Sequence, residues 1–231
     1  FNPPSIMANE HFGVNVALTA HLLDTIRETL PETRFIFAGS CAAYGEGNDL
    51  QEDAFPSPKT ILGAAKQSAR LLLEVYAELY GLRTQNLCLF TPFGPWESRN
   101  RLIPHIILSA LEGRSIEMTE GLQQRDFLYI DDVVDAFMRA AVSEVPGGTT
   151  INICSGTPIQ VRELACMLLE IMGGNVELKF GALPTRSDEI RIISGNNRRA
   201  SDILDWRPKH SLREALELTV SWFQNNKSLY I

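Results

Sequence analysis

The sequence predicts an α/β fold in which a doubly wound parallel sheet is joined to a smaller mixed α/β lobe. Short apolar runs alternate with helical segments over the first 90 residues, which is the pattern of strand–helix–strand units. After Gly94-Pro95 the segments become shorter and more irregular, which indicates a second lobe. A chain of 231 residues is long enough for one large domain or two small ones with an ample core.

The first half of the chain contains the clearest elements. Residues 11–29 carry apolar side chains at helical spacing, and 34–38 form a short aromatic and β-branched run typical of a buried strand. Residues 61–80 repeat the helical spacing, and Gly81 follows as a left-handed cap would. Residues 84–90 then predict the next strand.

The second half predicts shorter elements around two polar regions. Residues 48–59, with two prolines, are expected to form a loop. Asp131 is expected to cap a helix over 133–142, and Trp206 and Trp222 to anchor the core of the second lobe. The remaining predicted elements are helices at 102–113, 161–172 and 212–225 and strands at 115–119, 127–130 and 150–153.

Composition excludes several classes of protein. The net charge is −7, which disfavours a nucleic-acid partner because such binding needs a basic surface. No apolar run reaches the roughly 18–20 residues that a membrane span requires, so no membrane partner is expected. The four cysteines form no C-x-x-C pair, which favours reduced thiols in a cytoplasmic protein. The four histidines are scattered, so no metal site is expected.

Four polar residues are candidates for chemistry. Ser40 follows the strand at 34–38, at the sheet edge where open α/β proteins bind ligands; the alternative is a turn serine that bonds its own backbone. Lys66 follows the small residues Gly63-Ala64-Ala65, although it could be an ordinary surface charge. Arg125 and Arg186 could hold a phosphate through their guanidinium groups or could be surface charges.

Taken in order, several motifs resemble the extended short-chain dehydrogenase/reductase family, in its nucleotide-sugar epimerase, dehydratase and reductase branch. The resemblance extends from about Val14 to Phe223. Its landmarks are Val14-Asn15-Val16 with Thr19, Ser40-Cys41-Ala42-Ala43-Tyr44-Gly45, Gly63-Ala64-Ala65-Lys66, Thr91-Pro92-Phe93-Gly94-Pro95, Arg125-Asp126-Phe127, Asn152-Ile153-Cys154-Ser155-Gly156, Arg186-Ser187-Asp188-Glu189 and Asp205-Trp206-Arg207-Pro208.

The resemblance implies a Rossmann-type fold, NAD or NADP as cofactor and a nucleotide sugar as substrate. It also implies a role for individual residues. The implied catalytic residues are Ser40, Lys66 and Asn15; the implied cofactor-binding residues are Lys66, Pro92 and Ala38; the implied substrate-binding residues are Ser40, Thr91, Arg125 and Arg186. Family members also pair through two long helices, so a homodimer through 11–29 and 61–80 is expected.

Two departures from the family pattern bear on activity. The family has a tyrosine acid/base four residues before the lysine, but position 62 is Leu, and an isobutyl group cannot transfer a proton. The glycine-rich turn that cradles the dinucleotide pyrophosphate is absent. Because the chain begins at Phe1, we expect a fragment that lacks the front of the Rossmann fold and binds cofactor weakly.

A smaller departure separates the activities within the branch. The dehydratases place Asp-Glu directly after the catalytic residue, whereas Cys41-Ala42 stands here, so dehydration ranks below epimerisation or ketone reduction. Cys88 and Thr91 replace an Arg and an Asn of the branch, which removes one expected polar contact near the sugar.

The resemblance also implies the domain organisation. Residues 1–95, rejoined by 126–154, are expected to be the C-terminal part of the NAD(P)-binding domain. Residues 96–125 and 155–231 are expected to form the substrate-binding lobe.

The sequence therefore predicts an NAD(P)-dependent nucleotide-sugar epimerase or 4-ketoreductase that transfers hydride at a sugar carbon. The alternative is a catalytically impaired family member that binds a nucleotide or sugar nucleotide without turnover, and Leu62 is its main support. A third interpretation, a generic α/β ligand-binding domain, explains the strand–helix rhythm but not the ordered motifs.

Overall fold

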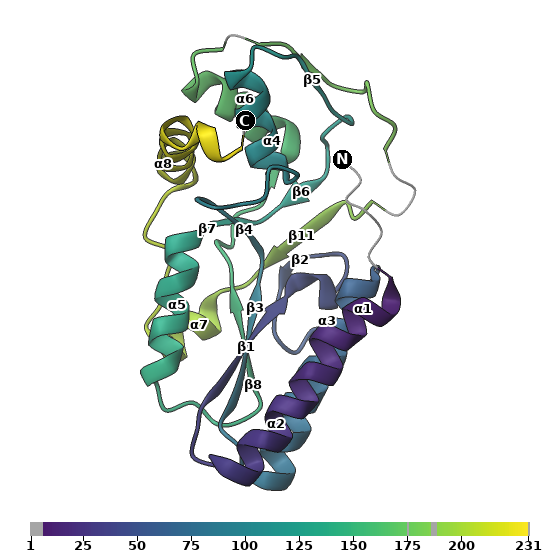
Figure 1. The fold of residues 1–231 in the computed structure, drawn as a ribbon, viewed down its shortest axis with the longest axis vertical. Coiled ribbons are helices and arrows are strands. Elements are labelled where there is room, and N and C mark those ends of the chain that lie inside the picture. Colours follow the sequence, from purple (N-terminus) through teal and green to yellow (C-terminus); the bar gives the residue numbers. More distant parts are fainter. Residues whose placement is uncertain (1–6, 175, 186–188, 231) are drawn as a thin grey trace.

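The computed structural model describes residues 7–174, 176–185 and 189–230. It has two lobes that lie end to end (Figure 1). The lower lobe in that view is built on a parallel sheet with long helices. The upper lobe is mainly helical and contains the C-terminal end of the chain.

A three-stranded parallel sheet forms the centre of the lower lobe. Its strands β1 (Phe35–Ser40), β3 (Thr84–Leu89) and β8 (Thr149–Ile153) lie in the order β1-β3-β8. Because alternate residues of a strand face opposite sides, Phe35 and Phe37 pack on one face and Ile36 on the other.

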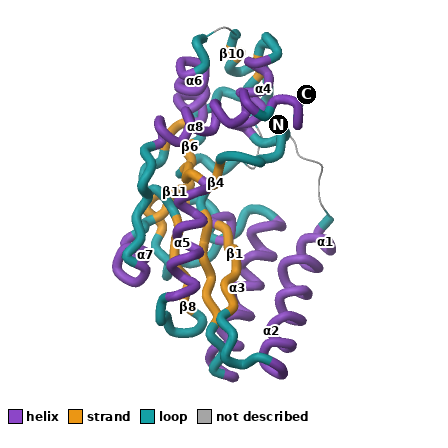
Figure 2. Tube along the Cα trace, turned by 60° about the vertical axis from the view of Figure 1, so that its left-hand side comes forward, coloured by secondary structure: helices purple, strands orange, loops and turns teal. Residues whose placement is uncertain are grey.

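Helices cover both faces of this sheet. Helices α2 (Leu18–Thr29) and α3 (Ile61–Tyr80) pack on the side of Phe35 and Phe37. Helices α5 (Ile130–Val142) and α7 (Arg198–Leu204) pack on the opposite side, as Figure 2 shows. The predicted α/β fold, a partial Rossmann doubly wound parallel sheet with a smaller mixed lobe, is confirmed.

The long helix α3 begins and ends where the sequence predicts. The Thr60 hydroxyl oxygen accepts a hydrogen bond from the Gly63 amide at 3.0 Å and caps the N-terminus. Gly81 ends the helix in the left-handed region, with φ 69°. The helix predicted over 11–29 is also present, but it consists of α1 (Ala8–Phe12), a π-helical turn η1 (Gly13–Ala17) and α2.

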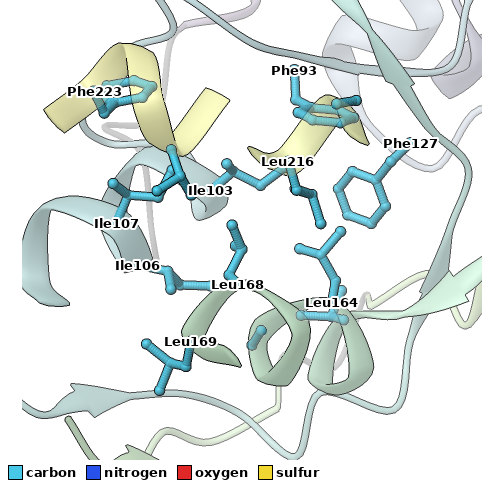
Figure 3. Close-up of a cluster of buried hydrophobic side chains, with 14 of the residues drawn as sticks. Phe93, Ile103, Ile106, Ile107, Phe127, Leu164, Leu168, Leu169, Leu216 and Phe223 are labelled. Atoms are coloured by element: carbon cyan, nitrogen blue, oxygen red, sulfur yellow. The ribbon is translucent and has the colours of Figure 1, made fainter. Parts of the chain in front are cut away.

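Three helices enclose the core of the upper lobe. Helices α4 (Leu102–Leu111), α6 (Val161–Ile171) and α8 (Leu212–Asn225) direct their apolar faces into one cluster. Figure 3 shows this cluster, in which Phe93 and Phe127 lie beside the leucines of α6 and α8. A two-stranded pair, β5 (Ile116–Glu117) and β10 (Leu178–Lys179), borders the lobe.

Short strands connect the two lobes. Strand β4 (Thr91–Phe93) pairs with β7 (Phe127–Tyr129). A four-stranded sheet has the order β2-β11-β6-β9, with bounds Gly47–Leu50, Ile192–Gly195, Gln124–Arg125 and Ile159–Gln160. Two 3₁₀ turns, η2 (Cys41–Ala43) and η3 (Lys227–Leu229), complete the elements. The loop predicted over 48–59 is wrong at its start, because β2 pairs there with the distant strand β11.

Two further predictions are corrected by the structure. Helix α5 begins at Ile130 with Tyr129 as its cap, and Asp132 instead accepts hydrogen bonds from the Lys209 and His210 amides. Trp206 is fully buried against β3, β8 and α5, not in the upper lobe. Its indole nitrogen donates to the Asp132 carbonyl oxygen at 2.9 Å. The segment that follows β11 therefore packs against the central sheet and α5.

Candidate functional site

Ser40 ends strand β1 and begins the turn η2. Its hydroxyl oxygen accepts a hydrogen bond from the Ala42 amide at 3.2 Å, as expected for a turn serine. This bond uses one lone pair and leaves the O–H donor and a second lone pair available. The structural interpretation and the catalytic interpretation of Ser40 are therefore compatible.

Gly63 brings helix α3 against this turn. A Cβ atom at position 63 would lie 2.2 Å from the Ala42 carbonyl oxygen, which is far inside van der Waals contact. Only glycine permits such an approach. The close contact joins the first turn of α3 to the turn after Ser40. The small residues before Lys66 thus have a packing function that the sequence pattern alone did not explain.

Lys66 reaches from α3 to the carboxyl end of β1. Its ammonium donates to the Ala38 carbonyl oxygen at 2.8 Å and lies 4.6 Å from the centre of the Phe37 ring. Burial lowers the pKa of the Lys66 ammonium below its ordinary value. Ser40 and Lys66 therefore both gather near the end of β1, and Ala38 lies between them on the exposed side of the strand.

Leu62 lies one turn before Lys66 on the same helix. Residues at i and i+4 share one face, so Leu62 and Lys66 point to the same side of α3. The Leu62 side chain is 37% exposed, and a hydrocarbon offers no donor or acceptor there.

Asn15 lies in the π-helical turn η1, which packs against α3. Its amide donates to the His11 carbonyl oxygen of its own helix at 2.9 Å. Single π turns often occur at functional sites, and this turn sets the position of Asn15. The structure gives Asn15 no direct bond to Ser40 or Lys66 among the described residues.

Thr91 and Pro92 form the start of β4, directly after β3. Both are half-buried, and the Thr91 amide donates to the Asp126 carbonyl oxygen at 2.9 Å. The pairing of β4 with β7 fixes these residues beside the Arg125-Asp126-Phe127 motif.

Arg125 is held by the segment 189–190. Its guanidinium donates to the Ile190 carbonyl oxygen at 2.8 Å and forms an ion pair with Glu189. Arg125 therefore already has partners, which a phosphate group would have to replace or share. Arg186, the other predicted phosphate ligand, lies outside the described residues.

Asp126 belongs to the Arg125-Asp126-Phe127 motif, although the sequence assigns it no role of its own. Its carboxylate is fully buried and accepts hydrogen bonds from the Ser155 hydroxyl at 2.7 Å and from the amides of Ser155, Gly156 and Gly195. Burial raises the pKa of this carboxyl group. Asp126 joins three segments and so fixes the backbone beside Arg125; its place directly after Arg125 was the only signal.

The surroundings of Tyr44 and Cys41 indicate structural and not catalytic roles for these residues. Tyr44 is 2% exposed, and its hydroxyl donates to the Asn152 side-chain oxygen at 2.8 Å, so it does not replace a tyrosine at position 62. Burial raises the pKa of the Cys41 thiol to about 12, which suppresses the reactive thiolate. Within the described residues there is no group of three or more His, Cys, Asp or Glu side chains that could hold a metal.

Helices on both faces of a parallel sheet, with a hydroxyl and an ammonium at its carboxyl edge, define a ligand-binding α/β protein of the Rossmann type. Residues 5–154 match the model of the NAD dependent epimerase/dehydratase family. The chain belongs to this family, as its motifs implied.

Relatives with known names are nucleotide-sugar epimerases. The UDP-glucose 4-epimerase of Mycolicibacterium smegmatis is 29% identical over 92% of this chain and 69% of that protein. The UDP-glucuronate 4-epimerase of Thermodesulfobacterium geofontis is 28% identical over 93% of this chain and 66% of that protein. Across the curated relatives compared, the chain spans 52% to 69% of their length.

Solved structures agree with this grouping. The UDP-glucose 4-epimerase of Thermotoga maritima, with UDP-glucose, superposes with a TM-score of 0.88 and 28% identity over 95% of this chain and 72% of that one. The UDP-glucuronic acid 4-epimerase of Bacillus cereus, with UDP-glucuronic acid and NAD, gives 0.85 and 27% over 94% and 68%. No helix in the described part of the chain is long and apolar enough to cross a bilayer.

Proposed function

We propose that this chain is the catalytic part of an NAD(P)-dependent nucleotide-sugar epimerase or 4-ketoreductase. The observation that carries the proposal is the contact at Gly63, which holds the Ser40 turn against the helix that bears Lys66. The relatives named above are UDP-sugar 4-epimerases, which favours a UDP-sugar as substrate.

The residues present fit one end of a dinucleotide. In this proposal the nicotinamide and its ribose bind beside Lys66, Ala38 and Pro92, and the Lys66 ammonium is a donor suited to ribose hydroxyls. The 231 residues contain no glycine-rich phosphate turn. When bound, the cofactor supplies the hydride chemistry, whereas the protein supplies position and electrostatics.

The chain's own residues have separate tasks in this proposal. The Ser40 O–H donates to the sugar oxygen and polarises it. The half-buried positive charge of Lys66 favours the anionic form of an acid beside it. Arg125 and Arg186 bind the diphosphate, and Arg125 exchanges its bond to Glu189 for one to the phosphate oxygens.

Leu62 favours a second candidate function. With no hydroxyl one turn before Lys66, the chain has no direct proton donor at that point. A protein of this kind would bind a nucleotide or sugar nucleotide and release it unchanged. An ordered water held by Ser40 and Lys66 is the substitute that the first function requires.

The two functions can be distinguished at position 62. We expect Leu62→Tyr to raise conversion of UDP-glucose or UDP-glucuronate on the order of 10²-fold, the contribution of one positioned acid/base. Leu62→Phe, which has the ring without the hydroxyl, is the matched control and should give no gain. Conversion is measured by chromatographic separation of the sugar-nucleotide epimers at millimolar NAD, with cofactor binding followed by NADH fluorescence.

The possible results of these measurements distinguish the two functions. Bound NADH without conversion in any variant would support the binding function and contradict the epimerase. Micromolar NAD binding by the 231 residues would contradict the expectation of weak binding. Loss of NADH fluorescence in Lys66→Ala would support the role of Lys66 at the cofactor.

We also propose a homodimer through the outer faces of α2 and α3. Leu18 and Leu22 on α2, and Leu71 and Leu79 on α3, are 40% to 65% exposed and recur at helical spacing, although buried leucine is the norm. Figure 1 shows the two helices side by side at one edge of the molecule. Leu22→Glu should shift the chain from dimer to monomer in light scattering, whereas Leu218→Glu on α8 should not.

The location in this proposal is the cytoplasm. The four cysteines are unpaired in the structure, which suits a reducing compartment. The net charge of −7 favours small ligands bound at local arginines over nucleic acid.

A further inference from the structure

A cavity lies beside β4 and β7, apart from the side chains of the sequence-predicted site. Its volume is about 820 Å³, and none of Ser40, Lys66 and Thr91 lines it. Cavities of this size accept small organic molecules. Its wall combines the apolar side chains of Phe93, Phe127 and Leu212 with the polar side chains of Asn197, Arg198 and His210.

The apolar wall is rigid and aromatic. Phe93 and Phe127 are 3% and 6% exposed and meet edge to face, with ring centres 6.2 Å apart. Figure 3 shows both rings at the border of the helical core. Pro158 and Pro208 extend this wall, so the cavity offers flat surfaces to a planar group.

His210 is oriented by a buried carboxylate. Asp132 is 1% exposed and lies 3.0 Å from Nδ1 of His210. An ionised carboxylate only accepts hydrogen bonds, so Nδ1 carries the proton and Nε2 is the ring nitrogen available to a ligand. The ring also meets Tyr129 edge to face, with centres 5.0 Å apart, which fixes its plane.

Two guanidinium groups line the cavity. Arg198 forms a 3.6 Å ion pair with Asp202, and both side chains are largely exposed, so the pair is weak. Arg207 donates from Nε to the Ser201 hydroxyl at 3.1 Å, and within the described ranges no carboxylate lies in ion-pair distance of it. Arg207 is therefore the guanidinium of the cavity wall that is most readily available to an anionic ligand.

We propose that this cavity binds a phosphate monoester that carries a planar apolar group. The guanidinium forks match phosphate oxygens, and the oriented His210 ring lies in the same wall of the cavity. The aromatic and proline wall covers the planar group. This site is separate from the proposed nucleotide-sugar site and does not depend on its activity.

Phenyl phosphate is the probe that contains both features. We expect it to bind the purified 231-residue chain in calorimetry, and Arg207→Gln to weaken its affinity about tenfold, which is the loss of one charge-assisted contact. Arg213→Gln, on the nearby helix α8 but paired with Glu170 and Glu217, is the matched control and should leave the affinity unchanged. Benzoate and phenol should bind more weakly than phenyl phosphate.

Three results would overturn the proposal. The first is no binding of phenyl phosphate to the unmodified chain. The second is equal affinity for benzoate, which would exclude a phosphate-selective site. The third is loss of binding in Lys66→Ala with full binding in Arg207→Gln, which would assign the phosphate to the sheet edge instead.

Discussion

The two lobes differ in how completely they bury their apolar surface. In the upper lobe, α4, α6 and α8 enclose a core in which Ile106, Leu168 and Phe223 are fully buried. In the lower lobe, β1 pairs with β3 alone among the described strands, and α2 and α3 leave leucines exposed on their outer faces. The open lobe is the one that carries Ser40 and Lys66. The catalytic candidates therefore lie in the lobe whose central sheet has an unpaired edge among the described strands.

The largest expected effect tests the closed lobe. Leu168→Ala removes a fully buried side chain from the core between α4, α6 and α8 and should lower the free energy of unfolding by about 3 kcal/mol. Ile36→Ala, at a half-buried position on β1, should cost about 1 kcal/mol. Urea denaturation measures both values. Equal losses of unfolding free energy in the two variants would contradict the difference in burial between the two lobes.

A smaller effect is expected at the contact between α3 and η2. Gly63→Ala places a methyl group 2.2 Å from the Ala42 carbonyl oxygen, so one of the two segments must shift, at a cost of about 1–3 kcal/mol. Gly13→Ala is the matched control, because nothing lies within 4 Å of its added Cβ and its φ of −57° suits alanine. It should be neutral or stabilise by about 0.5 kcal/mol. A stable Gly63→Ala variant with unchanged chemical shifts at Ser40 would contradict the close contact.

The smallest effect concerns a carboxyl group of the upper lobe. Burial raises the pKa of Glu97 above its ordinary value of 4.5, against the opposing effect of Arg101. The folded state therefore binds the Glu97 proton more tightly than the unfolded state does. The resulting contribution to folding stability is present below pH 4.5 and is lost as the pH rises through the raised pKa. Glu97→Gln should remove this part of the pH dependence of unfolding. Glu78→Gln, on the exposed face of α3, should leave it unchanged.

The sequence predicts the long elements well, for physical reasons. Residues 61–80 repeat an apolar stripe over many turns and end at Gly81, and the structure confirms both. Strands β2 and β11 have four residues each, too few for a visible period, and they pair across about 145 residues of chain. Such pairing depends on tertiary contacts that no local pattern reports.

The candidate site also has features that the sequence predicts and features that it does not. The sequence predicts Ser40 at the sheet edge, and the family resemblance implies a shared site with Lys66; both side chains lie near the end of β1. The partners of Arg125 come from a segment about 65 positions away, so its orientation was not predictable. The sequence predicts Asp131 as the helix cap, but α5 begins after Tyr129, and the carboxylate of the neighbouring Asp132 bonds to Lys209 and His210. A side chain beside a helix start can serve either purpose, and only the fold decides.

The outer edge of β1 has a consequence for the behaviour of the protein in solution. A strand paired on one side presents a row of free amide and carbonyl groups, which is a template for another strand. The Lys66 ammonium blocks one of these groups by binding the Ala38 carbonyl oxygen, and its charge repels a stacking neighbour of the same kind. We therefore expect Lys66→Ala to favour concentration-dependent aggregation of the 231-residue chain.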